Sequence, residues 1–157
     1  MDLSNVLVVL AIAASPISEL RGAIPIAIVG FHFPWYYAFL LAIIGNLLPV
    51  PLLLLFFGTL PKLLNKIGIL DTMSHRLSER TRRRGKIIER YERIGLILFV
   101  AIPLPITGAW TGSLAAVLFG IKFKYAFLSI FIGILIAGSI VTGATLLGWN
   151  IFGLWEA

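Results

Sequence analysis

Two charged side chains, Glu19 and Arg21, lie inside an apolar stretch that runs from residue 3 to residue 31. A guanidinium can hold a phosphate or carboxylate with two hydrogen bonds, and a desolvated carboxyl can exchange a proton. A spacing of two residues separates side chains on a helix, whereas an extended turn directs them to one side. We therefore predict a non-helical turn that directs both side chains into one cavity, where Arg21 binds an anion and Glu19 transfers a proton.

The same pair also has a purely structural interpretation. Glu19 and Arg21 would then neutralise each other and hold the turn in place, with no contact to a substrate. Placing a charge at the depth of a bilayer costs roughly 2.5–3.5 kcal/mol on insertion scales. Because two apolar residues would form a less costly turn, the functional interpretation is favoured, and the structural one stays open.

A second break, without charges, interrupts the apolar stretch from residue 94 to residue 121. Prolines and glycines in PLPITGAWTG (103–112) prevent a continuous helix there. Helices that begin after Gly22 and after Gly108 would present free N–H groups, which attract anions. The expected substrate-binding residues are Glu19, Arg21, Thr107, Thr111 and, if it stacks on substrate rather than packing in the turn, Trp110. The residues expected to shape the turns are Pro16, Gly22, Pro25, Pro103, Pro105, Gly108 and Gly112.

The composition identifies the class of protein that must position these residues. Of 157 residues, 59% are hydrophobic and only 13% are charged, whereas soluble domains average about 25% charged residues. The chain is therefore an integral membrane protein, and the composition argues against a soluble enzyme. The chain has no cysteine, and His32 and His75 stand alone, with no second ligand at the spacing of a metal motif, so we expect no cofactor, no metal site and no enzymatic activity.

The basic residues gather in one window. Ten of the thirteen lie between Lys62 and Arg93 together with four of the seven acidic residues, so this window carries the whole net charge of +6. The positive-inside rule places it in the cytoplasm, where lysine and arginine contact anionic lipid headgroups. The window follows a membrane span and has no recognised nucleic-acid fold, so we expect lipid contact and no nucleic-acid partner. The spacing of apolar residues predicts an amphipathic helix over about 71–93.

Four apolar blocks flank this window, at residues 3–31, 35–58, 94–121 and 125–149. The second and fourth are long enough to span a bilayer, which needs ~20 residues. The flanks of the breaks in the first and third blocks reach only about half of a ~30 Å hydrocarbon core, which predicts re-entrant hairpins. This topology keeps Lys122 and Lys124 in the cytoplasm and places both termini outside.

Two single features of the full-length blocks add to this picture. Pro49 and Pro51 should kink the second block, and Asn46 is expected to form a hydrogen bond inside the helical bundle. In the fourth block, small residues at a spacing of four, such as Gly133 with Ala137 and Ser139 with Gly143, favour close helix packing.

The two halves of the chain repeat each other at an offset of 88–90 residues. Gly22 pairs with Gly112 at 90, and Gly45 pairs with Gly133 at 88. Because the hairpins would enter from opposite sides, the halves form an inverted repeat, as in many secondary transporters. We predict an all-α integral membrane protein with a single transport domain over 1–157. It comprises repeats at 1–59 and 94–157, each a re-entrant hairpin followed by a transmembrane helix, joined by a basic amphipathic cytoplasmic connector at 60–93.

Residues 15–31 (SPISELRGAIPIAIVGF) and 101–120 (AIPLPITGAWTGSLAAVLFG) resemble the small multidrug export family, which looks like a distant branch of the DedA/VTT superfamily. The resemblance implies two re-entrant hairpins in an inverted repeat, and transport. Its DedA relatives are associated with the translocation of polyprenyl-phosphate carriers or phospholipids. Two departures weaken a transfer of that scheme: residues 94–121 lack the usual arginine, and Ile106 stands where glycine is expected.

The expected function is movement of an anionic substrate, such as a phosphate-bearing lipid, across the membrane. Coupling of this movement to protons is part of the hypothesis. The expected location is the plasma membrane of a prokaryote, as a multi-pass protein surrounded by membrane lipids and assembled as a dimer or larger homo-oligomer. One alternative is proton-driven export of cationic drugs with Glu19 as the cation site. The other is a membrane scaffold that transports nothing.

Overall fold

The computed structural model describes residues 2–66, 86–104 and 107–153. Within these ranges the chain is helical and contains no strand, which confirms the all-α class. The helices are α1 (Leu3–Ala14), α2 (Glu19–Pro25), η1 (Ile26–Gly30, one turn of π-helix), α3 (Trp35–Leu47), α4 (Val50–Lys66), α6 (Lys86–Ala101), α7 (Ala109–Leu118) and α8 (Phe123–Gly153).

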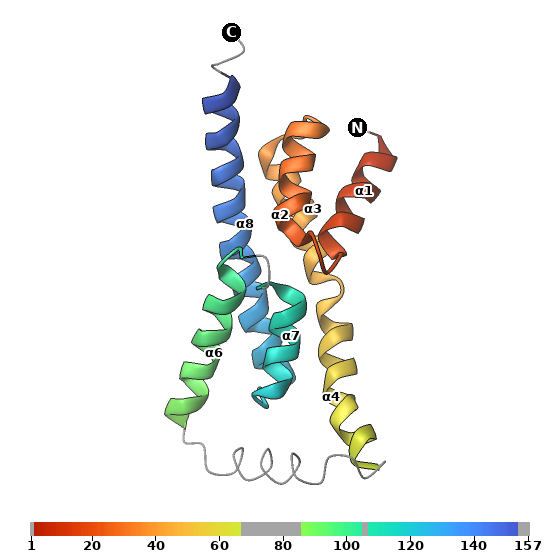
Figure 1. The fold of residues 1–157 in the computed structure, drawn as a ribbon, viewed down its shortest axis with the longest axis vertical. Helices are drawn as coiled ribbons and strands as arrows, with labels where there is room; N and C mark the ends of the chain where they lie inside the picture. The colour runs from red at the N-terminus through yellow and green to blue at the C-terminus, as the bar shows by residue number, and fades with distance from the viewer. Residues whose placement is uncertain (1, 67–85, 105–106, 154–157) are drawn as a thin grey trace.

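Two pairs of short helices occupy opposite halves of the molecule (Figure 1). Helices α1 and α2 pack side by side in the upper half, and the turn between them lies near the middle. Helices α6 and α7 form the corresponding pair in the lower half, and their turn also lies near the middle. The two turns therefore face each other, although the sequence separates them by about 90 residues.

Longer helices run beside both pairs. Segments Trp35–Thr59 and Phe123–Trp149 are each long and apolar enough to cross a membrane, which confirms two of the predicted spans. The first is interrupted near Pro49, since α3 ends at Leu47 and α4 begins at Val50. A proline ring clashes with the preceding helical turn and lacks an N–H, so the predicted kink occurs there.

Glycines let a long helix approach each pair closely. A Cβ added at Gly45 of α3 would lie 2.7 Å from the Cβ of Ala13 in α1. A Cβ added at Gly133 of α8 would lie 2.7 Å from the Cβ of Val100 in α6. Both distances are too short for non-bonded carbons, so these glycines occupy equivalent contacts in the two halves. The predicted close packing is present at Gly133, whereas a Cβ added at Gly143 would meet nothing within 4 Å among the described residues.

Four helix ends lie at two opposite ends of the molecule in Figure 1. The first turn of α1 and the last turn of α8 lie toward one end, while the end of α4 and the start of α6 lie at the other. Helix α4 continues to Lys66 and α6 begins at Lys86, so both extend into the expected 60–93 connector. Most of the amphipathic helix predicted over 71–93 lies outside the described residues.

Candidate functional site

The turn between α1 and α2 is shorter than the sequence suggested. The backbone N–H of Ser18 donates to Ser15 Oγ at 3.3 Å, and α2 begins immediately afterwards at Glu19. The prediction of an extended turn through Arg21 was therefore wrong, because Arg21 lies inside α2 and the helix starts three residues before Gly22. Glu19 has a φ of 47°, a left-handed conformation that side chains other than glycine rarely adopt. Both charged side chains nevertheless line one cavity.

The carboxylate of Glu19 lies at the N-terminus of α7. Its Oε1 accepts a hydrogen bond from the Trp110 N–H at 3.4 Å, and the Ala109 N–H is a second donor. At its N-terminus, helix α7 has free N–H groups that carry partial positive charge, so a carboxylate binds there favourably. Glu19 is 4% exposed, which leaves the helix end and Arg21 as its principal polar partners.

Gly108 makes this contact possible. It is the residue before α7, and a Cβ added to it would collide with the Glu19 carboxylate. The backbone at Gly108 is extended, so the need for glycine comes from the space that the carboxylate fills rather than from its conformation. The sequence identified this glycine as a turn residue, and the structure adds a contact across 89 positions in the chain.

Arg21 reaches the same second turn. Its Nη1 donates to the carbonyl oxygen of Leu104, and its Nη2 lies 3.7 Å from Glu19 Oε2. Leu104 follows the end of α6 at Ala101, where helical carbonyl groups run out of partners. The two charges of α2 therefore bind backbone groups on both sides of the second turn: the acid binds N–H groups of α7, and the base binds the Leu104 carbonyl.

Trp110 forms the reciprocal contact. Its indole Nε1–H donates to the carbonyl oxygen of Ala14, the last residue of α1, at 3.1 Å. Ala14 and Leu104 are separated by 90 positions, the same offset that relates Gly22 to Gly112. Arg21 therefore donates to a carbonyl oxygen three residues beyond the end of α6, and Trp110 donates to the last carbonyl oxygen of α1. This contact favours packing over substrate stacking for Trp110.

The two threonines of the second turn bond within it. Thr107 Oγ1 accepts from the Leu104 N–H at 3.1 Å and donates to the Ile102 carbonyl. Thr111 Oγ1 lies 3.5 Å from the Gly108 carbonyl. Thr107 also lines the cavity, as does Pro103. The hydroxyl of Thr107 therefore has a structural role in the turn, and that of Thr111 has a weak one.

The remaining residues expected to shape the turns divide between the two pairs. A Cβ at Gly112 would collide with Val100 of α6, and one at Gly22 would lie 2.9 Å from Ser18 Cβ. Pro16 lies in the first turn, and Pro25 ends α2 where the π-helical turn begins. Pro105 lies outside the described residues.

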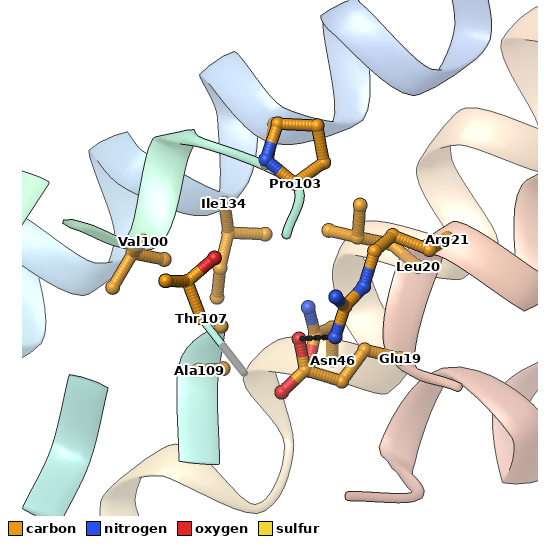
Figure 2. Close-up of a pocket in the computed structure, with 11 residues that line it drawn as sticks. Glu19, Leu20, Arg21, Asn46, Val100, Pro103, Thr107, Ala109 and Ile134 are labelled. Atoms are coloured by element: carbon orange, nitrogen blue, oxygen red, sulfur yellow. Dashed lines mark ion pairs between the residues drawn. The ribbon is translucent and has the colours of Figure 1, made fainter. Parts of the chain in front are cut away.

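Asn46 belongs to the site, although the sequence predicted for it only a hydrogen bond inside the helical bundle. It is 1% exposed, lines the cavity from α3, and lies beside Glu19 in Figure 2. Its Oδ1 has no hydrogen-bond partner among the described residues, so the predicted bundle hydrogen bond is wrong for this atom. The available signal was its position as a lone amide within an uncharged apolar block. A buried acceptor without a donor costs free energy, which a ligand can recover.

The unfilled space between the two turns is small, about what a single water molecule needs. Glu19, Arg21 and Asn46 approach it from α2 and α3, while Thr107 and Ala109 approach from the opposite turn (Figure 2). Within the described ranges no three histidine, cysteine or acidic residues come together as a metal site would require. The arrangement holds an anion between a guanidinium and a helix N-terminus, and the buried amide of Asn46 lies beside it, with no partner for its Oδ1 among the described residues.

Fold and site together define a small helical membrane protein with a polar junction between two pairs of short helices. The chain belongs to the family described as putative small multi-drug export protein, which matches residues 19–140. The match extends from the first residue of α2 through the turn between α6 and α7 and into α8 as far as residue 140. Searches of curated proteins and of solved structures found no match. Membership indicates an export protein of a membrane, and a transporter rather than an enzyme.

Proposed function

We propose that this protein moves an anionic substrate, a phosphate-bearing lipid or small molecule, through the junction between the two turns. One observation carries the proposal: the junction already binds an anion, the carboxylate of Glu19, between the α7 N-terminus and Arg21. Backbone N–H groups and an arginine are the groups that proteins commonly use to bind phosphate. Their location inside a largely apolar molecule suits a substrate that must leave water.

In this proposal the two pairs are re-entrant hairpins and the halves form an inverted repeat. Helix α1, at 12 residues, and α7, at 10 residues, are too short to cross a bilayer. The equivalent glycines, Gly45 and Gly133, and the equivalent carbonyls, of Ala14 and Leu104, support a repeat. Broken backbone at membrane depth requires burial in protein or a polar cavity, and the junction provides both.

The proposed orientation follows the basic residues. The end of the molecule that holds the end of α4 and the start of α6 faces the cytoplasm of a prokaryote, and both termini face outward. Lipids cover the exposed apolar side chains. We include a homodimer in the proposal, because a chain of 157 residues encloses little cavity by itself.

Glu19 is the proposed proton carrier. Its carboxylate is buried and lies within the ion pair that also binds the substrate anion. Protonation would remove its charge and weaken its hold on Arg21 and on α7. Proton transfer at Glu19 and anion transfer at Arg21 would then use one junction.

The test is transport by protein reconstituted in proteoliposomes. Labelled polyprenyl phosphate, a labelled phospholipid and a cationic dye are supplied to wild type, Arg21→Gln and Glu19→Gln, with Lys124→Gln as a matched loss of charge outside the junction. We expect Arg21→Gln to abolish transport of the anion and Lys124→Gln to retain it. Anion transport at the wild-type rate in correctly folded Arg21→Gln would contradict the proposal.

A second candidate, export of cationic drugs, rests on the acceptors in the cavity. Glu19 offers a carboxylate and Asn46 an unpartnered Oδ1, and both suit an ammonium group. The two candidates separate by charge, because cation export requires Glu19 and tolerates loss of Arg21. A protein that moves none of the three substrates, and tolerates both substitutions, would instead be a scaffold.

A further inference from the structure

We propose that the carboxylate of Glu19 is an internal competitor of the substrate: it occupies the anion site, and a phosphate monoester binds only by displacing it. This inference rests on the proposed function and deepens it. It assigns Glu19 a role opposite to that of a substrate ligand, since removing its charge strengthens anion binding instead of weakening it.

The first step is that Glu19 uses the donors that an anion needs. The N–H groups of Ala109 and Trp110 point to its carboxylate, and Arg21 lies 3.7 Å from the second carboxylate oxygen. These are the strong donors at the α7 end of the cavity. A substrate oxyanion can bind them only after the carboxylate has left.

The second step is steric. A single added methyl group at Gly108 would collide with the carboxylate, so no free volume remains between it and the N-terminus of α7. A phosphate group is larger than a methyl group. The two anions therefore cannot share this position, and their mutual repulsion across a few ångströms further opposes joint binding.

The third step concerns the chemistry of the occupant. Asn46 is 1% exposed, lines the same cavity and has an unpartnered acceptor in Oδ1. An ionised carboxylate has no proton to donate to it, whereas a singly protonated phosphate monoester has one hydroxyl. A phosphate monoester satisfies Arg21 and the N–H groups with its oxygens and Asn46 with its hydroxyl. Sulfate and phosphodiesters lack that hydroxyl.

Phosphate of this kind can come from free phosphate or from the headgroup of a lipid monophosphate. The probes are therefore inorganic phosphate and hexyl phosphate, titrated at pH 6 by calorimetry into the full chain in dodecyl maltoside micelles, which contain no phosphate. Sulfate is the control anion. Tighter binding of hexyl phosphate than of inorganic phosphate identifies a lipid headgroup, and equal binding identifies the free ion.

We expect Glu19→Gln to lower the Kd for phosphate about tenfold, the change that corresponds to losing one charge-assisted competitor. Arg21→Gln should abolish binding. Gly108→Ala should also abolish it, because its methyl group fills the position of either anion. Gly95→Ala, where an added Cβ meets nothing within 4 Å, should bind as wild type does.

Each outcome decides between the two ideas. Phosphate binding that depends on Arg21 but is unchanged or weakened in Glu19→Gln would overturn the proposal that Glu19 is an internal competitor. The proposed transport of an anion would be unaffected by that result. No phosphate binding by wild type or by folded Glu19→Gln overturns both. If Glu19→Gln does not elute as a single species, Glu19→Asp replaces it: the shorter side chain withdraws the carboxylate from α7, and phosphate must then bind more tightly than to wild type.

Discussion

The two turns at the centre of the molecule each join a pair of helices, and the residues around them contribute opposite kinds of chemistry. Helix α2, which follows the first turn, begins with Glu19 and contains Arg21, the charges that lie inside the apolar blocks. The turn before α7 belongs to a stretch, 94–121, without any charge, and offers the N–H groups of α7 and the Leu104 carbonyl. The first pair of helices contributes ionised side chains, and the second contributes backbone N–H and carbonyl groups.

This difference shows how buried charges can be tolerated without a second charged segment. A second charged pair in the turn before α7, beside Glu19 and Arg21, would place four charges in the interior, with a large desolvation penalty. Backbone groups at helix ends are already polar and need partners in any case. Pairing them with one acid and one base satisfies both turns with two charges. The missing arginine in the second turn is therefore consistent with an intact junction.

The largest expected effect comes from Arg21→Gln. The substitution removes the bond to Leu104 and leaves the buried Glu19 carboxylate without its cation. Because the side chain of Arg21 is 20% exposed, we expect a loss of about 2–3 kcal/mol in the free energy of unfolding, below that for a fully buried pair. The measurement is unfolding in detergent micelles by sodium dodecyl sulfate.

Lys124→Gln is the matched control for Arg21→Gln, since it removes a basic charge at the start of α8, where its side chain is exposed. It should change the free energy of unfolding by less than about 0.5 kcal/mol. If both substitutions changed the free energy of unfolding equally, the contact between the two turns would not depend on Arg21.

Gly108→Ala tests the other side of the comparison. Its methyl group would occupy the position of the Glu19 carboxylate, so either the acid leaves α7 or the two turns move apart. Overpacking of this kind costs about 1–3 kcal/mol. The same unfolding measurement detects it, with Gly95→Ala in open space on α6 as the control.

Gly95→Ala should be neutral or stabilising by up to about 1 kcal/mol, because alanine favours a helix more than glycine does. A neutral Gly108→Ala would show that the carboxylate does not occupy the end of α7, and would remove the basis for the internal competitor.

Sequence reasoning predicted the helices, both breaks and the shared cavity of Glu19 and Arg21, because prolines, glycines and isolated charges act locally. It missed the contacts between the turns. The bond from Trp110 to Ala14 spans 96 positions, and the contact of Glu19 with α7 spans 91. Such contacts depend on how two distant pairs face each other, which local patterns do not encode. The start of α2 at Glu19 was missed because Ser15 and Ser18 complete the turn earlier than Gly22.

Trp110→Phe isolates the hydrogen bond that the second turn returns to the first. Phenylalanine keeps an aromatic ring in place but cannot donate to the Ala14 carbonyl. A neutral hydrogen bond contributes about 1 kcal/mol, so the free energy of unfolding should fall by that amount and by less than for Arg21→Gln. Trp35→Phe, at an indole that is 54% exposed, is the control and should be silent. If Trp110→Phe lowered the free energy of unfolding more than Arg21→Gln does, the hydrogen bond from Trp110 would contribute more to the junction than the contacts of Arg21.

Asn46→Leu should have the smallest effect on stability and the most specific effect on binding. Oδ1 of Asn46 has no partner among the residues that the structure describes, so replacing the amide by an apolar side chain of similar volume should change the free energy of unfolding by less than about 1 kcal/mol, in the stabilising direction. The phosphate hydroxyl then loses its acceptor. Wild type should prefer phosphate to sulfate at pH 6, and Asn46→Leu should bind the two alike, as calorimetric titration would measure. A strong loss of stability would instead mean that Asn46 already holds a structural partner, and an undiminished preference for phosphate would place the hydroxyl elsewhere in the junction.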